Sequence, residues 1–155
     1  MGERTPHLDA TARAAWVGLT NSHTRADLIR AVIEGVSYSQ RDCLDIIEEL
    51  GVTVNSVRAS GGGAKSAFWR ELLAGILNQR VATLETQEGS AYGAALLALV
   101  GTGEYGGVPE VCRATIRETG AVSPGADAAF YARAHRVYQA LYPALKPIYG
   151  MIAEL

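Results

Sequence analysis

Three consecutive glycines, Gly61, Gly62 and Gly63, form the part of the sequence with the clearest potential for chemistry. Glycine has no Cβ atom, so the backbone at these positions can turn sharply and lie flat against a ligand. A helix-forming run follows at once, and the free N–H groups at the start of a helix can face an anion or the edge of a ring. The pattern therefore indicates a loop that binds a ligand through its backbone.

Two standard phosphate-binding motifs do not fit this loop. A Walker A motif needs a glycine directly before its lysine, whereas Lys65 follows Ala64. A dinucleotide-binding GxGxxG motif that starts at Gly61 needs a glycine at the position of Ser66. From the pattern alone, a tight strand-to-helix turn without a ligand explains the glycines equally well.

Elsewhere in the sequence, no nucleophile or general base has a suitable partner. The histidines are far apart and follow no metal-ligand spacing, which favours surface or turn positions. Four acids are spaced to share the solvated polar face of a helix, and the two tryptophans have apolar neighbours that favour a core position. These residues are His7, His23, His135, Asp42, Asp45, Glu48, Glu49, Trp16 and Trp69.

Apolar periodicity predicts the elements that would position the loop. Spacings of three, four and seven residues indicate a long amphipathic helix that begins near Thr24 and ends at Gly51. A short β-branched run over residues 52–59 predicts a strand that leads into the glycines, and a helix over residues 64–78 follows them.

The second half of the sequence continues this alternation of strands and helices. The order predicts an α/β fold in which helical crossovers join the strands. Pro143 and Pro147 should bend or interrupt the last helix, because proline lacks the N–H of a regular helical residue. The expected elements are a strand over residues 81–84 and helices over residues 91–100, 109–116 and from about 127 onward.

Length and composition indicate one globular unit. Of 155 residues, 48% are hydrophobic and 19% are charged, which allows a buried core and excludes a disordered tail. A formal net charge of −2 argues against a surface for nucleic acid or for an anionic membrane. The start lacks the pattern of a signal peptide, and Cys43 and Cys112 have no CxxC spacing, so we expect a reduced cytoplasmic setting.

A longer pattern extends over nearly the whole sequence, from Gly2 to about Met151. It includes the glycine loop with Trp69 and Arg70 after it, and a segment rich in small residues at 88–95. It also includes a long motif of a small residue, an aromatic residue and Gly-Leu, then, after a gap, an acidic residue and small or apolar residues that end in an acid. The residues that match its positions are Ala14, Trp16, Gly18, Leu19, Asp27, Leu28, Ala31, Val32, Ile33 and Glu34. In these features the sequence resembles the C-terminal half of the FGGY family of carbohydrate kinases, and within it the xylulokinases.

The resemblance implies an actin-like ATPase (ribonuclease H-like) fold, with residues 1–155 as a partial C-terminal nucleotide-binding domain of long helices on a small sheet. Such kinases use ATP and Mg²⁺, and those acting on D-xylulose form xylulose 5-phosphate. Their catalytic Asp and sugar pocket lie on an N-terminal domain, to which nothing in this sequence corresponds. We therefore expect no catalytic residue and no metal ligand here, and no turnover by these residues alone.

The resemblance also assigns the nucleotide-binding residues. They are Gly61, Gly62, Gly63, Ala64, Lys65, Ser66, Gly89 and Ser90. Lys65 is the one cation of the loop and could reach a phosphate, but a solvated side chain is an equal alternative. The segment Glu3, Arg4 and Thr5 belongs to a family region near the cleft, without a chemical role that the sequence assigns.

Two alternatives belong to other classes of protein. The chain could be a non-catalytic module that associates with itself, as a homodimer, or with a partner through exposed apolar surface. A Rossmann-type enzyme is the weaker alternative, because the GxGxxG pattern fails and no acidic residue ends a second strand at the required distance. The expected partners of the kinase are ATP and a pentulose, with no nucleic acid and no membrane.

Overall fold

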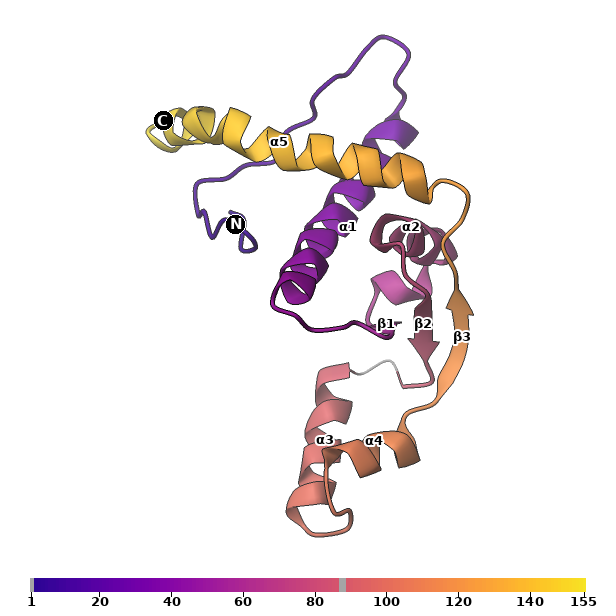
Figure 1. Ribbon diagram of the computed structural model, residues 1–155. Helices are drawn as coiled ribbons and strands as arrows, with labels where there is room; N and C mark the ends of the chain where they lie inside the picture. Colours follow the sequence, from indigo (N-terminus) through magenta and orange to yellow (C-terminus); the bar gives the residue numbers. More distant parts are fainter. Residues whose placement is uncertain (1, 87–88) are drawn as a thin grey trace.

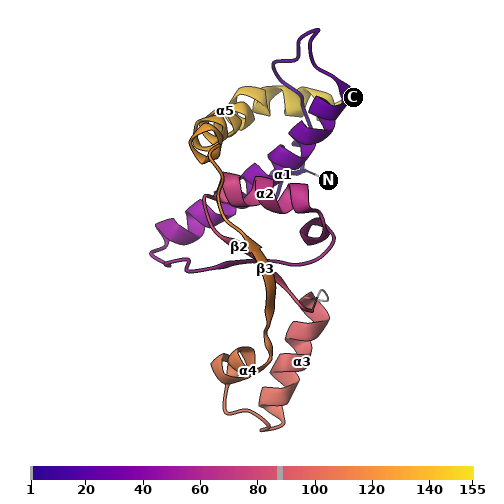
Figure 2. The same cartoon turned by 90° about the vertical axis from the view of Figure 1, so that its right-hand side faces the viewer.

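The computed structural model describes residues 2–86 and 89–155 (Figure 1). Its elements are α1 (Arg25–Glu49), β1 (Val57–Ala59), the 3₁₀ turn η1 (Gly63–Lys65), α2 (Ala67–Leu77), β2 (Val81–Leu84), α3 (Gly89–Gly101), α4 (Val108–Thr115), β3 (Glu118–Val122) and α5 (Ala128–Ala153). In Figure 1, α1, α2 and α5 pack together above the strands, and α3 and α4 extend below them. The turned view in Figure 2 shows the same elongated arrangement.

Helix α1 has the bounds that the sequence predicts, because each of its ends carries a local signal in the sequence. At its start, the Asp27 carboxylate accepts hydrogen bonds from the backbone N–H of Thr24 (2.8 Å) and from its hydroxyl (2.7 Å). These bonds lower the pKa of Asp27, chiefly through the backbone N–H. At its end, Gly51 takes a φ of +82°, a conformation that glycine adopts without strain.

The three strands form one sheet in the order β1–β2–β3. Strands β1 and β2 are parallel and are joined through α2, which confirms the helical crossover predicted from the sequence. Strand β3 pairs antiparallel to β2, with Thr83 opposite Gly120. The sequence analysis missed β3, because residues 118–122 show no apolar alternation and the strand is held by backbone pairing.

Two predicted elements, one strand and one helix, have different bounds in the structure. The strand predicted over residues 52–59 is only Val57–Ala59, because β2 offers partners to these three residues alone. The helix predicted over residues 64–78 is divided into η1 and α2. Glu88, the first residue of the 88–95 segment, lies outside the described residues.

The core lies where α1, α2 and α5 meet. Its buried centre consists of Tyr38 from α1, Leu72 and Ile76 from α2, and Tyr131 from α5. Gly75 has no side chain to displace the Tyr131 ring, since a Cβ there would lie 2.9 Å from that ring. The fold therefore uses a helical glycine for close packing between α2 and α5.

Helix α5 runs through Pro143 and Pro147 without interruption, so an interruption at these residues was a wrong expectation. Each proline removes one N–H of the helical ladder and frees the carbonyl four residues earlier, those of Gln139 and Pro143. Gln139 and both prolines are exposed, so water can bond the freed carbonyls. No described helix, this long one included, is apolar enough to cross a membrane.

A buried polar pair joins α1 to α5. His135 Nε2 lies 2.8 Å from Asp42 Oδ1, and the side-chain amide of Gln139 donates to the same oxygen at 2.9 Å. His135 and Asp42 are 7% and 6% exposed, so the expectations of a surface histidine and of a solvated acid were wrong. The two residues come from helices far apart in the sequence, and the spacing within either helix gives no sign of the pair.

Replacing His135 with alanine should lower the free energy of unfolding by about 3 kcal/mol, because Asp42 would stay buried without its main partner. Urea denaturation followed by circular dichroism would measure this loss. His23→Ala is the matched control, because His23 is exposed and, among the described residues, its ring bonds Thr20 of its own turn. Equal stabilities of the two variants would contradict a supporting role for the pair.

Candidate functional site

The glycine loop connects β1 to α2 and has a defined backbone conformation. Gly61 takes a φ of +79°, which favours glycine, and Gly62 has ordinary helical angles of −61° and −43°. The backbone N–H groups of Lys65 and Ser66 then donate to the carbonyl oxygens of Gly62 and Gly63, each at 3.2 Å. The loop is therefore an ordered turn that ends in η1.

Side chains of α2 hold the end of the loop. The Ser66 hydroxyl caps the helix by accepting a hydrogen bond from the backbone N–H of Trp69 at 3.3 Å. The Arg70 guanidinium donates to the Ala64 carbonyl. Ala64 is half-buried and Ser66 is exposed, and these two predicted site residues connect the loop to α2 through the two hydrogen bonds.

The second predicted segment begins α3 and lies against the first. A Cβ on Gly89 would stand 3.1 Å from the hydroxyl oxygen of Ser60, the residue before the glycines. A side chain at position 89 would require the Ser60 hydroxyl to shift by a few tenths of an ångström, so the two segments approach closely here. The fold thus brings together two regions that the sequence analysis had connected only by resemblance. Ser90 follows in the first turn of α3 and is exposed.

Open space lies above Gly61 and Gly62. Apart from each glycine and its chain neighbours, no atom of residues 2–86 and 89–155 stands within 4 Å of the position that a Cβ would take on either residue. Gly61 needs glycine for its positive φ, but neither the angles nor the neighbours of Gly62 require one. The flat backbone at Gly62 is therefore available to another molecule.

Lys65 is exposed, and within the described residues no carboxylate lies within 4 Å of its ammonium group. The loop itself carries no carboxylate and no imidazole. Its chemical means are backbone N–H groups, one hydroxyl and one cation. Such a set is suited to a polar or anionic ligand.

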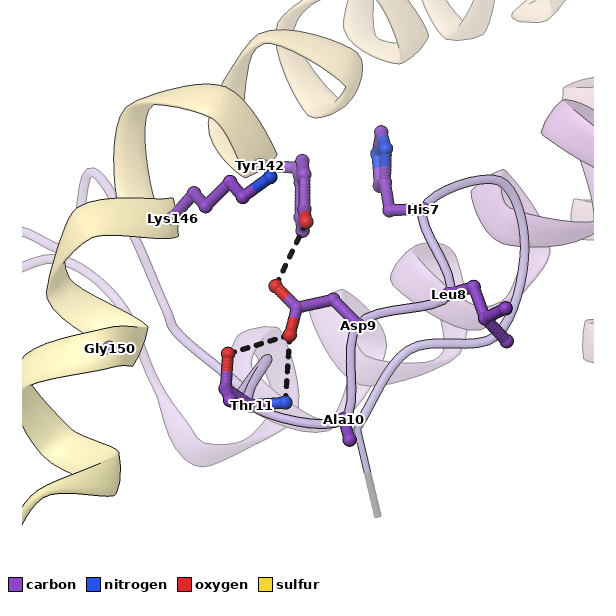
Figure 3. Close-up of a pocket in the computed structure, with 8 residues that line it drawn as sticks. All are labelled: His7, Leu8, Asp9, Ala10, Thr11, Tyr142, Lys146 and Gly150. Atoms are coloured by element: carbon purple, nitrogen blue, oxygen red, sulfur yellow. Dashed lines mark hydrogen bonds between the residues drawn. The ribbon is translucent and has the colours of Figure 1, made fainter.

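A separate cavity of about 360 Å³ lies between the N-terminal segment and α5 (Figure 3). Asp9 accepts bonds from the Thr11 backbone N–H and hydroxyl and from the Tyr142 hydroxyl. The Thr11 bonds, followed by that of Tyr142, lower the pKa of Asp9 to about 2. The His7 ring stacks on Tyr142 with 3.5 Å between centroids. These contacts attach the N-terminal segment to α5, and no residue of the glycine loop lines the cavity.

The N-terminal family segment takes part in the same folded turn. Glu3 forms a β-bridge with Asp9, and its carboxylate accepts a hydrogen bond from the His7 backbone N–H at 2.9 Å. These contacts assign Glu3 a structural role in shaping the turn.

Asp42, Asp45 and His135 are close enough to suggest a metal site. Both carboxylates already have hydrogen-bond partners, however. Asp42 accepts bonds from His135 and Gln139, and Asp45 pairs with Arg41 at 2.6 Å. The cluster therefore connects helices.

The tryptophans differ from the expected core positions. Trp16 is 51% exposed, so that expectation was wrong. Trp69 is half-buried, with its ring against the glycine loop. The sequence analysis treated Trp69 as a core residue and as a family marker, and missed its contact with the loop.

Comparisons with known proteins identify the class to which this fold and loop belong. Residues 1–102 match the FGGY family of carbohydrate kinases, C-terminal domain. The chain therefore belongs to the FGGY family, which confirms the resemblance seen in the sequence.

Individual relatives give a more specific comparison than the family match does. A xylulose kinase from Staphylococcus epidermidis is 39% identical over 148 residues, which are 95% of this chain and 30% of the relative. The solved structures of a gluconate kinase and a ligand-bound xylulose kinase, both from Lactobacillus acidophilus, match with TM-scores of 0.86 and 0.85. Their identities are 31% and 30%, and each match covers 97% of this chain and 31% of the other.

These matches confirm the predicted fold class, a part of the actin-like fold of sugar kinases. The chain spans about 30% of the length of its curated relatives.

Proposed function

We propose that residues 1–155 form a partial C-terminal domain that binds ATP for a carbohydrate kinase, and that the whole enzyme phosphorylates D-xylulose to xylulose 5-phosphate. The observation that carries the proposal is the close approach of Gly89 to Ser60, where a Cβ on Gly89 would lie 3.1 Å from the Ser60 hydroxyl, together with the open backbone of Gly62. The xylulose kinase names of the relatives support the choice of sugar.

In this proposal the loop binds the adenosine end of the nucleotide. The backbone of residues 61–63 lies along the ring and ribose, and Gly89 and Ser90 border the same surface. Lys65 belongs to the same loop, and among the described residues no carboxylate lies within 4 Å of its ammonium group. Its side chain can therefore extend toward a phosphate. Binding by backbone suits phosphoryl transfer, which depends on positioning and charge neutralisation more than on covalent chemistry.

Mg²⁺ would neutralise phosphate charge when it is bound with the nucleotide. The residues of this loop offer it no carboxylate, so in our proposal the metal enters on the phosphates. The general base and the sugar pocket are assigned to the N-terminal domain of the whole enzyme. Free cysteines at positions 43 and 112 suit the reducing cytoplasm in which we place this enzyme.

An ATP titration of the isotope-labelled chain, followed by NMR, tests the site. Amide signals of residues 61–66 and of Gly89 and Ser90 should shift together and saturate. Signals of the cavity beside Tyr142 should stay in place. No shifts at the loop up to millimolar ATP, or shifts confined to that cavity, would refute the site.

A second candidate function is self-association, as a homodimer. It is favoured by an apolar stripe on α1, where Ile29, Val32 and Val36 are 53%, 51% and 42% exposed at helical spacing. Light scattering would give the mass of the chain in solution. A monomer at all concentrations would exclude this candidate, and ATP binding by that monomer would leave the kinase proposal in place.

A further inference from the structure

The indole ring of Trp69 packs against the glycine loop at Gly63. If Gly63 carried a Cβ, that atom would lie 3.1 Å from Cε3 and 3.3 Å from Cζ3 of the ring. The backbone of Gly63 therefore rests directly on the indole. A change in the ring's orientation would be passed to the loop, because no side chain stands between them.

A hydroxyl group on α1 fixes the orientation of this ring. The Trp69 Nε1–H donates to the Ser37 hydroxyl oxygen at 3.1 Å. Ser37 is fully buried, and its own hydroxyl donates to the Ile33 carbonyl at 2.9 Å. Both hydrogen bonds of the hydroxyl are thus committed, one to its helix and one to the indole.

We propose that Ser37 is a positioning residue for the nucleotide loop, acting through Trp69 on Gly63. This inference rests on the proposed function of the loop. Backbone binding depends on where the loop's N–H groups point, so small movements of the supporting ring should weaken binding. A serine whose only role is to fill the core would affect stability without a selective effect on ATP.

Variants of the hydrogen bond separate these roles. Ser37→Ala removes the acceptor, and Trp69→Phe removes the donor together with the six-membered part of the indole, which carries Cε3 and Cζ3 next to Gly63. In Trp69→Phe the Ser37 hydroxyl still bonds Ile33, so this variant remains informative if Ser37→Ala does not fold. Ser39→Ala is the matched control, because the Ser39 hydroxyl bonds the Val36 carbonyl of the same helix at 2.8 Å, whereas the indole N–H bonds Ser37.

Two measurements on the 155-residue chain test the proposal. Hydrogen exchange of the Lys65 and Ser66 amides, which close η1, should be about fivefold faster in both bond-deleting variants than in Ser39→Ala. ATP dissociation constants should rise by about the same factor. The double variant should bind ATP no more weakly than Trp69→Phe alone, because Trp69→Phe already removes the hydrogen bond through which Ser37 acts.

The outcomes distinguish this inference from the function on which it rests. If the unmodified chain binds ATP and the Ser37→Ala and Trp69→Phe variants match Ser39→Ala in affinity and exchange, the positioning role is refuted. Faster exchange spread evenly over α2, with unchanged affinity, would also refute it. If the unmodified chain binds no ATP, the proposed function fails and the nucleotide role of Ser37 fails with it, whatever the exchange rates are.

Discussion

Replacing Gly62 with valine should weaken ATP binding by more than about tenfold and leave the fold intact. The helical angles of Gly62 are open to valine, and within the described part of the chain a Cβ there meets no atom within 4 Å beyond its own chain neighbours. The folded chain should therefore accept the side chain. In the proposed complex, the same side chain occupies the space where the nucleotide approaches the backbone. ATP titration and thermal unfolding by circular dichroism would measure the two effects separately.

Two other glycine variants make this comparison specific. Gly125→Val is the matched control, because a Cβ at that position also meets open space and its φ is not in the left-handed region, but it lies in the link from β3 to α5. Gly61→Val should instead reduce stability, because its φ of +79° strains a branched residue. If Gly62→Val bound ATP as tightly as Gly125→Val, the loop would be a turn without a nucleotide role.

The parts of the fold that the sequence predicted are those with local signals. Helix α1 has apolar periodicity, a capping pair at Thr24 and Asp27, and a terminating glycine, so its bounds were predicted within a residue or two. The crossover from β1 to β2 follows from the order of elements. Strand β3 has no such signal, because its sequence becomes a strand only through pairing with β2.

The candidate site likewise has one part that the sequence predicted and one part that it did not. Its glycines are visible in the sequence because a run of three glycines between a strand pattern and a helix pattern marks a sharp backbone turn. Its support is not visible, because Ser37 is one polar residue within a helix and its partner Trp69 lies on another helix. The pair of Asp42 and His135 was missed for this reason as well. Contacts between distant helices depend on tertiary packing, which single-sequence spacing does not encode.

The second large effect concerns turnover. The purified 155-residue chain should form no ADP in response to D-xylulose, even if it binds ATP. The glycine loop and residues 89–95 supply backbone groups, hydroxyls and one lysine, but no carboxylate or imidazole to accept the proton of a sugar hydroxyl. General-base catalysis is commonly worth about 10²–10⁴ in rate, and alignment of two bound reactants roughly 7–11 kcal/mol. Without either contribution, the rate of ADP formation by the chain should fall to that of uncatalysed ATP hydrolysis.

A coupled ADP assay with and without D-xylulose would measure this, and a chimera would identify what is lacking. Joining this chain to the preceding part of the Staphylococcus epidermidis xylulose kinase, which is 39% identical to it over the shared region, should produce sugar-dependent ADP formation. The same chimera with Gly62→Val should have a raised KM for ATP and a nearly unchanged KM for the sugar, because the loop would contact only the nucleotide. If the 155 residues alone formed ADP in response to the sugar, above a Gly62→Val control, the general base would have to lie among them, and the proposed division of roles would be wrong.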